Sequence, residues 1–173
     1  MLTAMCSLAF FDFLRIAKIT VNGKDHNNLI RLPQLESLVN DKRQVTALQL
    51  TILQDKHSNN GRSFTIYIHK EVSCCQVKVI IDFVSTRGSF NGPLFLLAGL
   101  DPITRSFIVG QLNRVLRVCN LDPALYKSHS FRIGAATWAA AKGFSDSQIR
   151  QLGRWKSNAF LKYIRVPSLS TVV

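Results

Sequence analysis

The stretch from Ser128 to Pro167 constrains the fold most, because it carries the signals of three helices in close succession. Its first residue or Ser130 can cap one helix, which Gly143 would end in the left-handed conformation. Ser145 and Gln148 have the spacing of a capping box, so a second helix should follow at once. A short third helix would end before the final proline.

Several side chains in this stretch could take part in chemistry. His129 and Arg132 are close enough in sequence to lie on the same side of the first helix, at its N-terminus. Phosphate binds well there, because backbone N–H groups and the positive end of the helix dipole point outward. Arg154 and Trp155 follow the second helix in the run L-G-R-W, and Tyr163 lies on the third. Taken singly, a tyrosine on an amphipathic helix is most often a packing residue.

The N-terminal run MLTAMCSLAFFDFLRIAKIT is mostly apolar. It differs from a signal peptide, because it lacks a basic leading region and has Asp12 and Arg15 where the apolar run should continue. It is also too short to span a bilayer. We therefore expect a buried helix, whose Arg15 either reaches solvent along its apolar stem or finds a buried partner.

The middle of the chain changes to strand-like periodicity. The segments 29–32, 45–53 and 64–69 are rich in β-forming residues and predict a small antiparallel sheet. Turn residues in the stretch 54–63 would join the last two strands as a hairpin, with Lys56 at its shoulder. A lysine at such an edge is commonly a charge that keeps the strand soluble.

Two further helices complete the predicted fold. One should cover 77–86 and end near Gly88, and the other should begin after Thr104. The second helix should bury an apolar stripe and keep its arginines outside. That stripe is Ile108, Leu112, Val115 and Val118. The sequence predicts an α+β fold, mainly α with a three-stranded antiparallel sheet, in one domain that spans residues 1–173.

The charge balance points to a polyanionic partner. The chain has 22 basic and 10 acidic residues and a net charge of +12, and Lys and Arg bind nucleic acid by releasing its counterions. Double-stranded DNA fits better than a membrane, because the basic residues crowd around the motifs rather than form a tail. The four cysteines show no C-x-x-C spacing, so we expect neither a disulfide framework nor a metal site, and no cofactor.

The order of the motifs resembles the catalytic domain of the tyrosine recombinases of the phage-integrase type. The motifs HSFRIGAAT, LGRW and YIR are similar to those of the recombinases of DIRS-like and Crypton-like eukaryotic mobile elements. AFFDFLRIAKIT resembles the family's first box, A-F-F-G-F-L-R-x-x-E, and the T-I-Y-I strand at 65–68 aligns Lys56 with the family's lysine hairpin. Asp12 stands where the family usually has Gly, and Lys18 where it usually has Glu.

The resemblance implies roles for seven residues. They are Arg15, Lys56, His129, Arg132, Arg154, Trp155 and Tyr163. Tyr163 would attack a DNA phosphate and form a covalent 3′-phosphotyrosine link, while Arg15 and Arg132 clamp the phosphate. Lys56 would protonate the leaving 5′ oxygen, and His129 would donate to the phosphate or accept the tyrosine proton. The position of the family's third motif, called the third box here, corresponds to Arg154 by its spacing from Tyr163 and to Trp155 by residue type.

The resemblance also implies a partner and a place of action. A site-specific recombinase or integrase of this kind would work on DNA in the nucleus, would self-associate there, and would usually carry a separate helical domain that completes a clamp. Because Arg15 lies so near the start, we expect an N-terminally truncated catalytic domain that recombines poorly alone. Two alternatives stay open: a catalytically degenerate DNA-binding module, which would tolerate Asp12 and Lys18, and an enzyme like the type IB topoisomerases.

Overall fold

The computed structural model describes residues 1–21, 23, 29–53, 63–70, 75–98 and 100–165. The described α-helices are α1 (Leu2–Phe11), α2 (Gln76–Arg87), α3 (Arg105–Val118), α4 (Ser130–Ala141) and α5 (Asp146–Leu152). The strands are β1 (Leu35–Val39), β2 (Val45–Ile52) and β3 (Phe64–His69). Short 3-10 helices are η1 (Ile16–Lys18), η2 (Leu32–Gln34), η3 (Pro123–Leu125) and η4 (Asn158–Tyr163). The predicted fold class is confirmed.

The sheet is antiparallel with the order β1-β2-β3, and Leu50 pairs with both Leu35 and Ile66. The predicted first strand at 29–32 is wrong. Pro33 has no N–H to give to a ladder, and the residues around it form η2. Ile30 instead donates to the Lys18 carbonyl and accepts from Leu94. The sheet therefore starts later, at the segment that follows η2.

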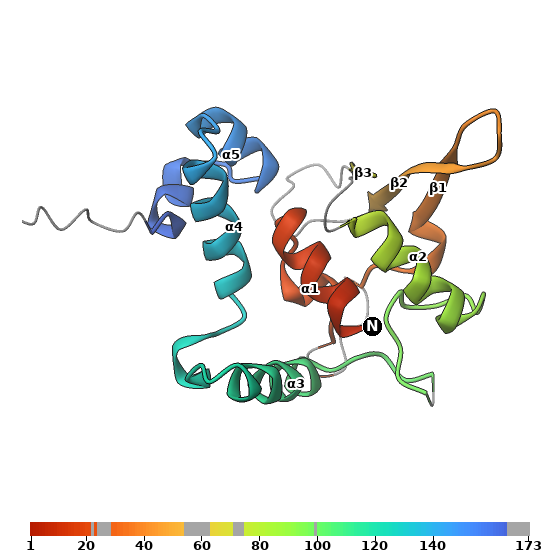
Figure 1. The fold of residues 1–173 in the computed structure, drawn as a ribbon, viewed down its shortest axis with the longest axis horizontal. Helices are drawn as coiled ribbons and strands as arrows, with labels where there is room; N and C mark the ends of the chain where they lie inside the picture. Colours follow the sequence, from red (N-terminus) through yellow and green to blue (C-terminus); the bar gives the residue numbers. More distant parts are fainter. Residues whose placement is uncertain (22, 24–28, 54–62, 71–74, 99, 166–173) are drawn as a thin grey trace, which may run out of the picture.

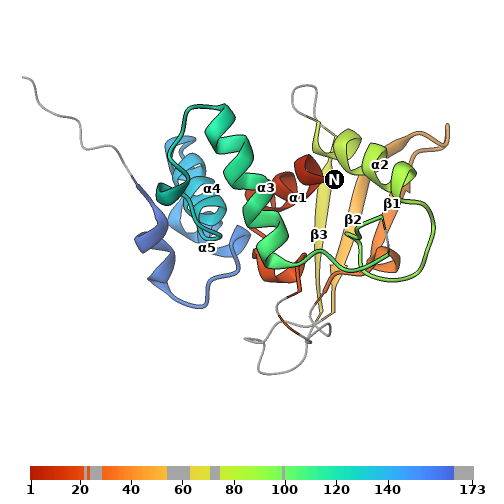
Figure 2. The same ribbon diagram turned by 90° about the horizontal axis from the view of Figure 1, so that it is seen from below.

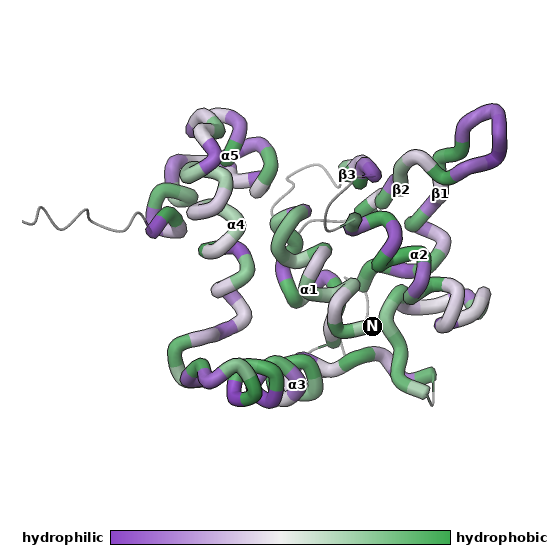
Figure 3. The backbone as a smooth tube through the Cα atoms, in the orientation of Figure 1, coloured by the Kyte–Doolittle hydropathy of each residue, from purple (hydrophilic) through white to green (hydrophobic). Residues whose placement is uncertain are grey.

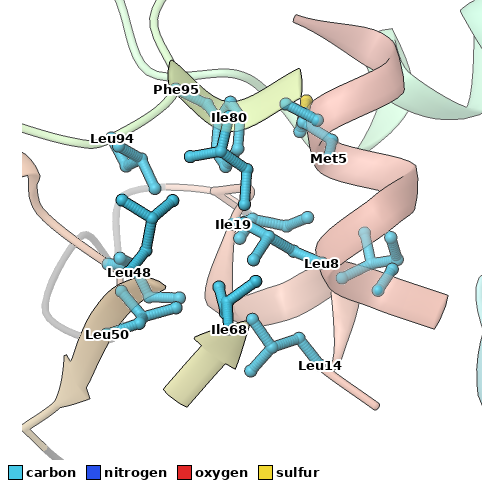
Figure 4. Close-up of a cluster of buried hydrophobic side chains, with 14 of the residues drawn as sticks. Met5, Leu8, Leu14, Ile19, Leu48, Leu50, Ile68, Ile80, Leu94 and Phe95 are labelled. Atoms are coloured by element: carbon cyan, nitrogen blue, oxygen red, sulfur yellow. The ribbon is translucent and has the colours of Figure 1, made fainter. Parts of the chain in front are cut away.

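The larger core lies between the sheet, α1 and α2 (Figure 4). Helix α1 has no charged residue, and a helix without a polar face is stable only when it is surrounded. Met5 and Leu8 of α1 meet Leu48 and Leu50 of β2, and Ile80 of α2 closes the cluster (Figure 4). The turn between β1 and β2, by contrast, is hydrophilic (Figure 3).

Helix α1 lies between the sheet layer and the C-terminal helices, with α4 and α5 on its other side (Figures 1 and 2). A smaller core of Ala135, Ala136, Ala139, Ile149 and Phe160 joins these helices to Phe13, just after α1. The segment that follows α1 is therefore held between the two cores, which is where the first-box arginine had been expected.

The observed helix ends agree with three of the capping signals in the sequence. The Thr104 hydroxyl accepts from the Phe107 N–H and caps α3, as predicted. Gly143 has a φ of +81°, and Phe144 N–H donates to the Ala139 carbonyl behind it, so the predicted end of α4 is also confirmed. The capping box of Ser145 with Gln148 is present at the start of α5.

Two details of these helices were predicted wrongly. His129 is the N-cap of α4, because the hydroxyl of Ser128 is taken by Arg105 and that of Ser130 by the Lys127 N–H. Leu152 was expected to share the buried side of α5 with Ile149, but it is 42% exposed, whereas Ile149 is buried.

The predicted apolar stripe of α3 is buried only near its start. Ile108 is 1% exposed, but Val115 and Val118 are 47% and 84% exposed. The reason is tertiary: the second half of α3 runs along the edge of the molecule, where the described part of the chain brings mainly η3 against it (Figure 1). No helix in the described ranges is long and apolar enough to cross a membrane.

Candidate functional site

Arg132 is the centre of the site and is only 5% exposed. Its Nη1 donates to the Phe13 carbonyl at 2.6 Å, and its Nη2 donates to the Gly153 carbonyl at 2.8 Å. The guanidinium also lies 4.3 Å from the centre of the Trp155 ring. A buried charge needs such partners, so one side chain ties α4 to the segment after α1 and to the turn after α5.

A small hollow of about 20 Å³ opens beside this arginine. It is lined by Phe13, Leu14, Arg15, Lys18, Phe64, Arg132, Gly153 and Arg154. Arg15 and Arg154 are half-buried, while Lys18 is 9% exposed. Four cationic side chains thus line one hollow, and no acidic side chain of the described residues does. The local field therefore favours an anion.

Trp155 contacts both Arg132, which lines the hollow, and Tyr163. Its ring meets Phe13 edge-on at 5.8 Å between ring centres and lies 5.4 Å from the Tyr163 ring. The ring folds back across Gly153, where an added Cβ would come within 1.6 Å of it. Gly153 has an ordinary helical φ of −83°, so this glycine is needed for space and not for backbone freedom.

Tyr163 ends η4 and is held to α4 through its backbone. Thr137 Oγ1 donates to the Tyr163 carbonyl at 3.3 Å and accepts from the Arg165 N–H at 2.9 Å. The centre of the His129 ring lies 6.4 Å from the centre of the Tyr163 ring, and His129 is exposed at the start of α4. Sequence reasoning missed Thr137, although one threonine in the middle of an alanine-rich helix was a usable signal.

Replacing Thr137 by valine should loosen the Tyr163 segment while keeping the shape of the side chain. Two backbone groups lose their partner, at about 1 kcal/mol for each hydrogen bond, so we expect the free energy of unfolding to fall by about 1–2 kcal/mol. Chemical denaturation measures this. Thr46→Val is the control, because the Thr46 hydroxyl also donates to a carbonyl, that of Leu38, but at an exposed position of β2. An equal loss in both variants would contradict the anchoring role.

Arg154 adopts a left-handed backbone conformation, with φ of +54°. Glycine is usual at this position after a helix, and another residue there costs about 1 kcal/mol. Its Nη2 donates to the Asp12 carbonyl at 2.6 Å, and its guanidinium lies 4.7 Å over the Phe64 ring. The Asp12 carboxylate accepts a hydrogen bond from Gln76 of α2. Burial raises the pKa of Asp12 from 3.8 to about 7, although Gln76 and the charge of Arg154 act the other way.

The structure brings most of the predicted site together. Arg15, Arg132 and Arg154 line the hollow. Trp155 contacts Arg132, Tyr163 packs against Trp155, and the His129 ring lies 6.4 Å from the Tyr163 ring. Lys56 lies outside the described residues. Arg105 was missed: it donates to the Ser128 hydroxyl at 2.5 Å and so fixes the chain just before His129.

The described residues hold three free thiols and no cluster of metal ligands. Cys6, Cys75 and Cys119 are free thiols. No group of three or more His, Cys, Asp or Glu side chains lies close enough to hold a metal ion within the described part of the chain.

The comparisons with known proteins match this chain to solved structures and so identify its fold. No protein-family model matches the sequence, and no curated protein matches it. A solved structure that does match is the Tn1549 transposon integrase, residues 82–397, in complex with circular intermediate DNA, with a TM-score of 0.56 and 14% identity. An arginine-to-lysine variant of the same integrase in complex with circular intermediate DNA gives a TM-score of 0.55.

A third match is a tyrosine-to-phenylalanine variant of that integrase in complex with transposon right end DNA, with a TM-score of 0.50. Each match covers 96% of this chain and 54% of the other. The chain thus spans about half the length of the structures that it matches. Over that half it has the integrase fold, as the resemblance had implied.

Proposed function

We propose that this protein is a DNA-binding integrase, a tyrosine recombinase that cleaves and rejoins DNA through Tyr163. The observation that carries the proposal is the hollow, where Arg15, Lys18, Arg132 and Arg154 converge, together with the Trp155 ring, which contacts both Arg132 and Tyr163. Arginine is the side chain best suited to phosphate, because its planar fork stays charged and binds two oxygens at once. The integrase fold, seen with DNA in the matched structures, supports the same reading.

The proposed reaction begins with attack of the Tyr163 hydroxyl on a DNA phosphodiester. The bond from phosphorus to the tyrosine oxygen forms, the bond to the 5′ oxygen breaks, and the phosphate stays on the 3′ end. Negative charge grows on the non-bridging oxygens, and Arg15 and Arg132 would offset it. Because Arg132 is fixed by two carbonyls and a ring, it needs little reorganisation as the charge develops.

Proton transfer completes the proposed step. The tyrosine proton would pass to His129 or to water, and Lys56 would protonate the leaving 5′ oxygen. The covalent link conserves the energy of the broken bond, so the reverse attack by a 5′ hydroxyl can rejoin the strands without another energy source. For the third-box position, the packing of Trp155 beneath Tyr163 favours Arg154 as the residue at the phosphate.

The affiliation with DIRS-like and Crypton-like mobile elements rests on the motifs HSFRIGAAT, LGRW and YIR. With it we propose action in the nucleus and self-association on DNA. Both follow from the way such elements insert into a chromosome, and both are separate from the chemistry at the hollow.

A suicide DNA substrate, nicked so that the cleaved product diffuses away, tests the reaction. We expect a covalent protein–DNA band after denaturation, and mass spectrometry of the digested adduct should place the DNA on the peptide that contains Tyr163. The band should persist in excess EDTA, because arginines supply the charge that a metal would. An adduct that EDTA removes and magnesium restores would contradict the mechanism.

A further inference from the structure

Lys18 lines the cationic hollow, although the motif that AFFDFLRIAKIT resembles has an acidic residue at this position. Its side chain is 9% exposed and lies in the hollow with those of Arg15, Arg132 and Arg154. The reaction proposed above assigns no step to this lysine. A glutamate here would offset the arginines, whereas a lysine adds to their positive charge, so this chain favours an anion more strongly than the resembled motif would.

The backbone around Lys18 is fixed on both sides. The Lys18 N–H donates to the Arg15 carbonyl at 2.8 Å in the turn η1, and the Lys18 carbonyl accepts from the Ile30 N–H at 2.9 Å. Side chains three residues apart in a 3-10 turn lie on the same side, so Lys18 and Arg15 both reach the hollow. Ile16 and Ile19 of this segment are each 3% exposed and anchor it in the larger core. The fold therefore holds the lysine at the site.

The charge at the hollow suits a reaction in which negative charge grows. Arginine does not lose its proton in proteins, so the three guanidiniums stay charged and an anion is needed to offset them. A DNA phosphodiester carries one negative charge, and attack on phosphorus adds charge to its non-bridging oxygens. A further cation therefore favours the transition state more than it favours the bound substrate, and this difference is what accelerates a reaction.

The size of the hollow indicates which atom of the phosphate enters it. Its volume of about 20 Å³ has room for one atom of the size of a water molecule, and a whole phosphate does not fit. The two bridging oxygens of a phosphodiester continue into the sugars on either side. A non-bridging oxygen carries no further group, so it is the atom that the hollow can enclose.

We propose that Lys18 is a further catalytic residue, which binds a non-bridging oxygen of the DNA phosphate in the hollow and offsets its charge as Tyr163 attacks. The proposal rests on the proposed function, because it takes the anion to be the phosphate that Tyr163 attacks. Lys18 transfers no proton in this role, and Lys56 remains the donor to the leaving 5′ oxygen. One of the two residues at which the chain departs from the resembled motif thus belongs to its chemistry.

The first experiment needs no DNA and uses inorganic phosphate as the probe. Phosphate bound at the hollow stabilises the folded chain by mass action, so the urea midpoint should rise as phosphate replaces chloride at constant ionic strength. Lys18→Met removes the charge and keeps an unbranched side chain. It should need at least about ten times more phosphate for the same rise, because a hydrogen bond to the anion is lost. Lys142→Met is the control, since Lys142 is exposed at the other end of α4, and it should keep the natural dependence.

This comparison separates contact with an anion from a purely structural role. A lysine that only packs would, when replaced, shift the midpoint equally in chloride and in phosphate, and the dependence on phosphate would stay natural. That result would overturn the proposal. Lys18→Glu should lose the dependence altogether, because it reverses the charge at the hollow. A natural dependence in this variant would contradict the proposal in the same way.

The second experiment measures how fast the covalent adduct forms on the suicide substrate. Lys18→Met should slow it by about a hundredfold, the usual effect of removing one donor aimed at developing charge, and Lys142→Met should leave it unchanged. A substrate with sulfur in place of the leaving 5′ oxygen distinguishes the two lysines, because a thiolate leaves without a proton. The sulfur should restore the rate of Lys56→Met and leave Lys18→Met slow. Restoration in Lys18→Met would make Lys18 the proton donor and overturn the proposed contact.

The outcomes separate this proposal from the proposed function. If the adduct forms at the natural rate in Lys18→Met, the role of Lys18 is wrong and the recombinase function stands. If the natural protein forms no adduct, although its dependence on phosphate requires Lys18, the proposed function fails, and with it the assignment of the anion to a DNA phosphate.

Discussion

Replacing Tyr163 by phenylalanine should abolish the covalent adduct and leave DNA binding unchanged. The variant removes the one atom that would attack phosphorus, so no link can form at this position. The ring should keep its place, because it still packs 5.4 Å from Trp155 and its backbone carbonyl still accepts from Thr137. Gel analysis of the suicide substrate measures the adduct, and fluorescence anisotropy with the same duplex measures binding.

Tyr126→Phe is the matched control. Tyr126 is 41% exposed in the connection before α4 and is the nearest other tyrosine in sequence to the site residues. It should form the adduct at the natural rate. An adduct that survives in Tyr163→Phe, or that disappears in Tyr126→Phe, would show that the nucleophile has been assigned to the wrong residue.

Local signals in the sequence predicted the helix ends well. The cap of Thr104, the left-handed Gly143 and the capping box of Ser145 each depend on a few neighbouring residues, so the chain specifies them without its tertiary context. The first strand was misplaced because Leu29 and Ile30 are apolar for another reason. Both side chains are buried, Ile30 in the larger core, and the backbone of this segment pairs with Gly92 and Leu94 rather than with the sheet.

Burial on α3 could not be predicted from periodicity either. A helical stripe indicates which side is apolar, but only tertiary packing decides how far along the helix a partner extends. Here the partner ends after Ile108 and Leu112, so Val115 and Val118 stay exposed.

The candidate site shows the same limit. The motifs assigned His129, Arg132 and Tyr163 to one site, and the structure brings them together, because each lies on or beside a helix that the sequence predicts. The contacts that fix them join distant parts of the chain. Arg132 reaches a carbonyl 119 residues away, and Arg154 reaches Asp12 across 142 residues. A sequence pattern cannot report which carbonyl a guanidinium will find.

Gly153 gives the largest expected loss of stability. Gly153→Ala should lower the free energy of unfolding by about 3 kcal/mol, because the new methyl group would overlap the Trp155 ring, and forcing a large ring out of a packed site costs this much. The displaced ring would also leave Arg132 and Tyr163 without their shared neighbour. Adduct formation should fall with it. Denaturation and the gel assay measure the two effects.

Gly110→Ala is the opposite case and serves as the control. Gly110 lies in the middle of α3 with nothing within 4 Å of an added Cβ. Alanine there should stabilise the protein by about 0.5–1 kcal/mol, because glycine is a poor helix former. The two substitutions add the same methyl group to residues with helical backbones, so a difference in sign can come only from the space around them.

A double-mutant cycle then identifies the cause of the Gly153 effect. In a Trp155→Ala background the ring is gone, so adding Gly153→Ala should cost less than about 0.5 kcal/mol. The coupling between the two positions should therefore be close to the whole loss of the single variant. If Gly153→Ala costs as much without the ring as with it, the clash is not the cause.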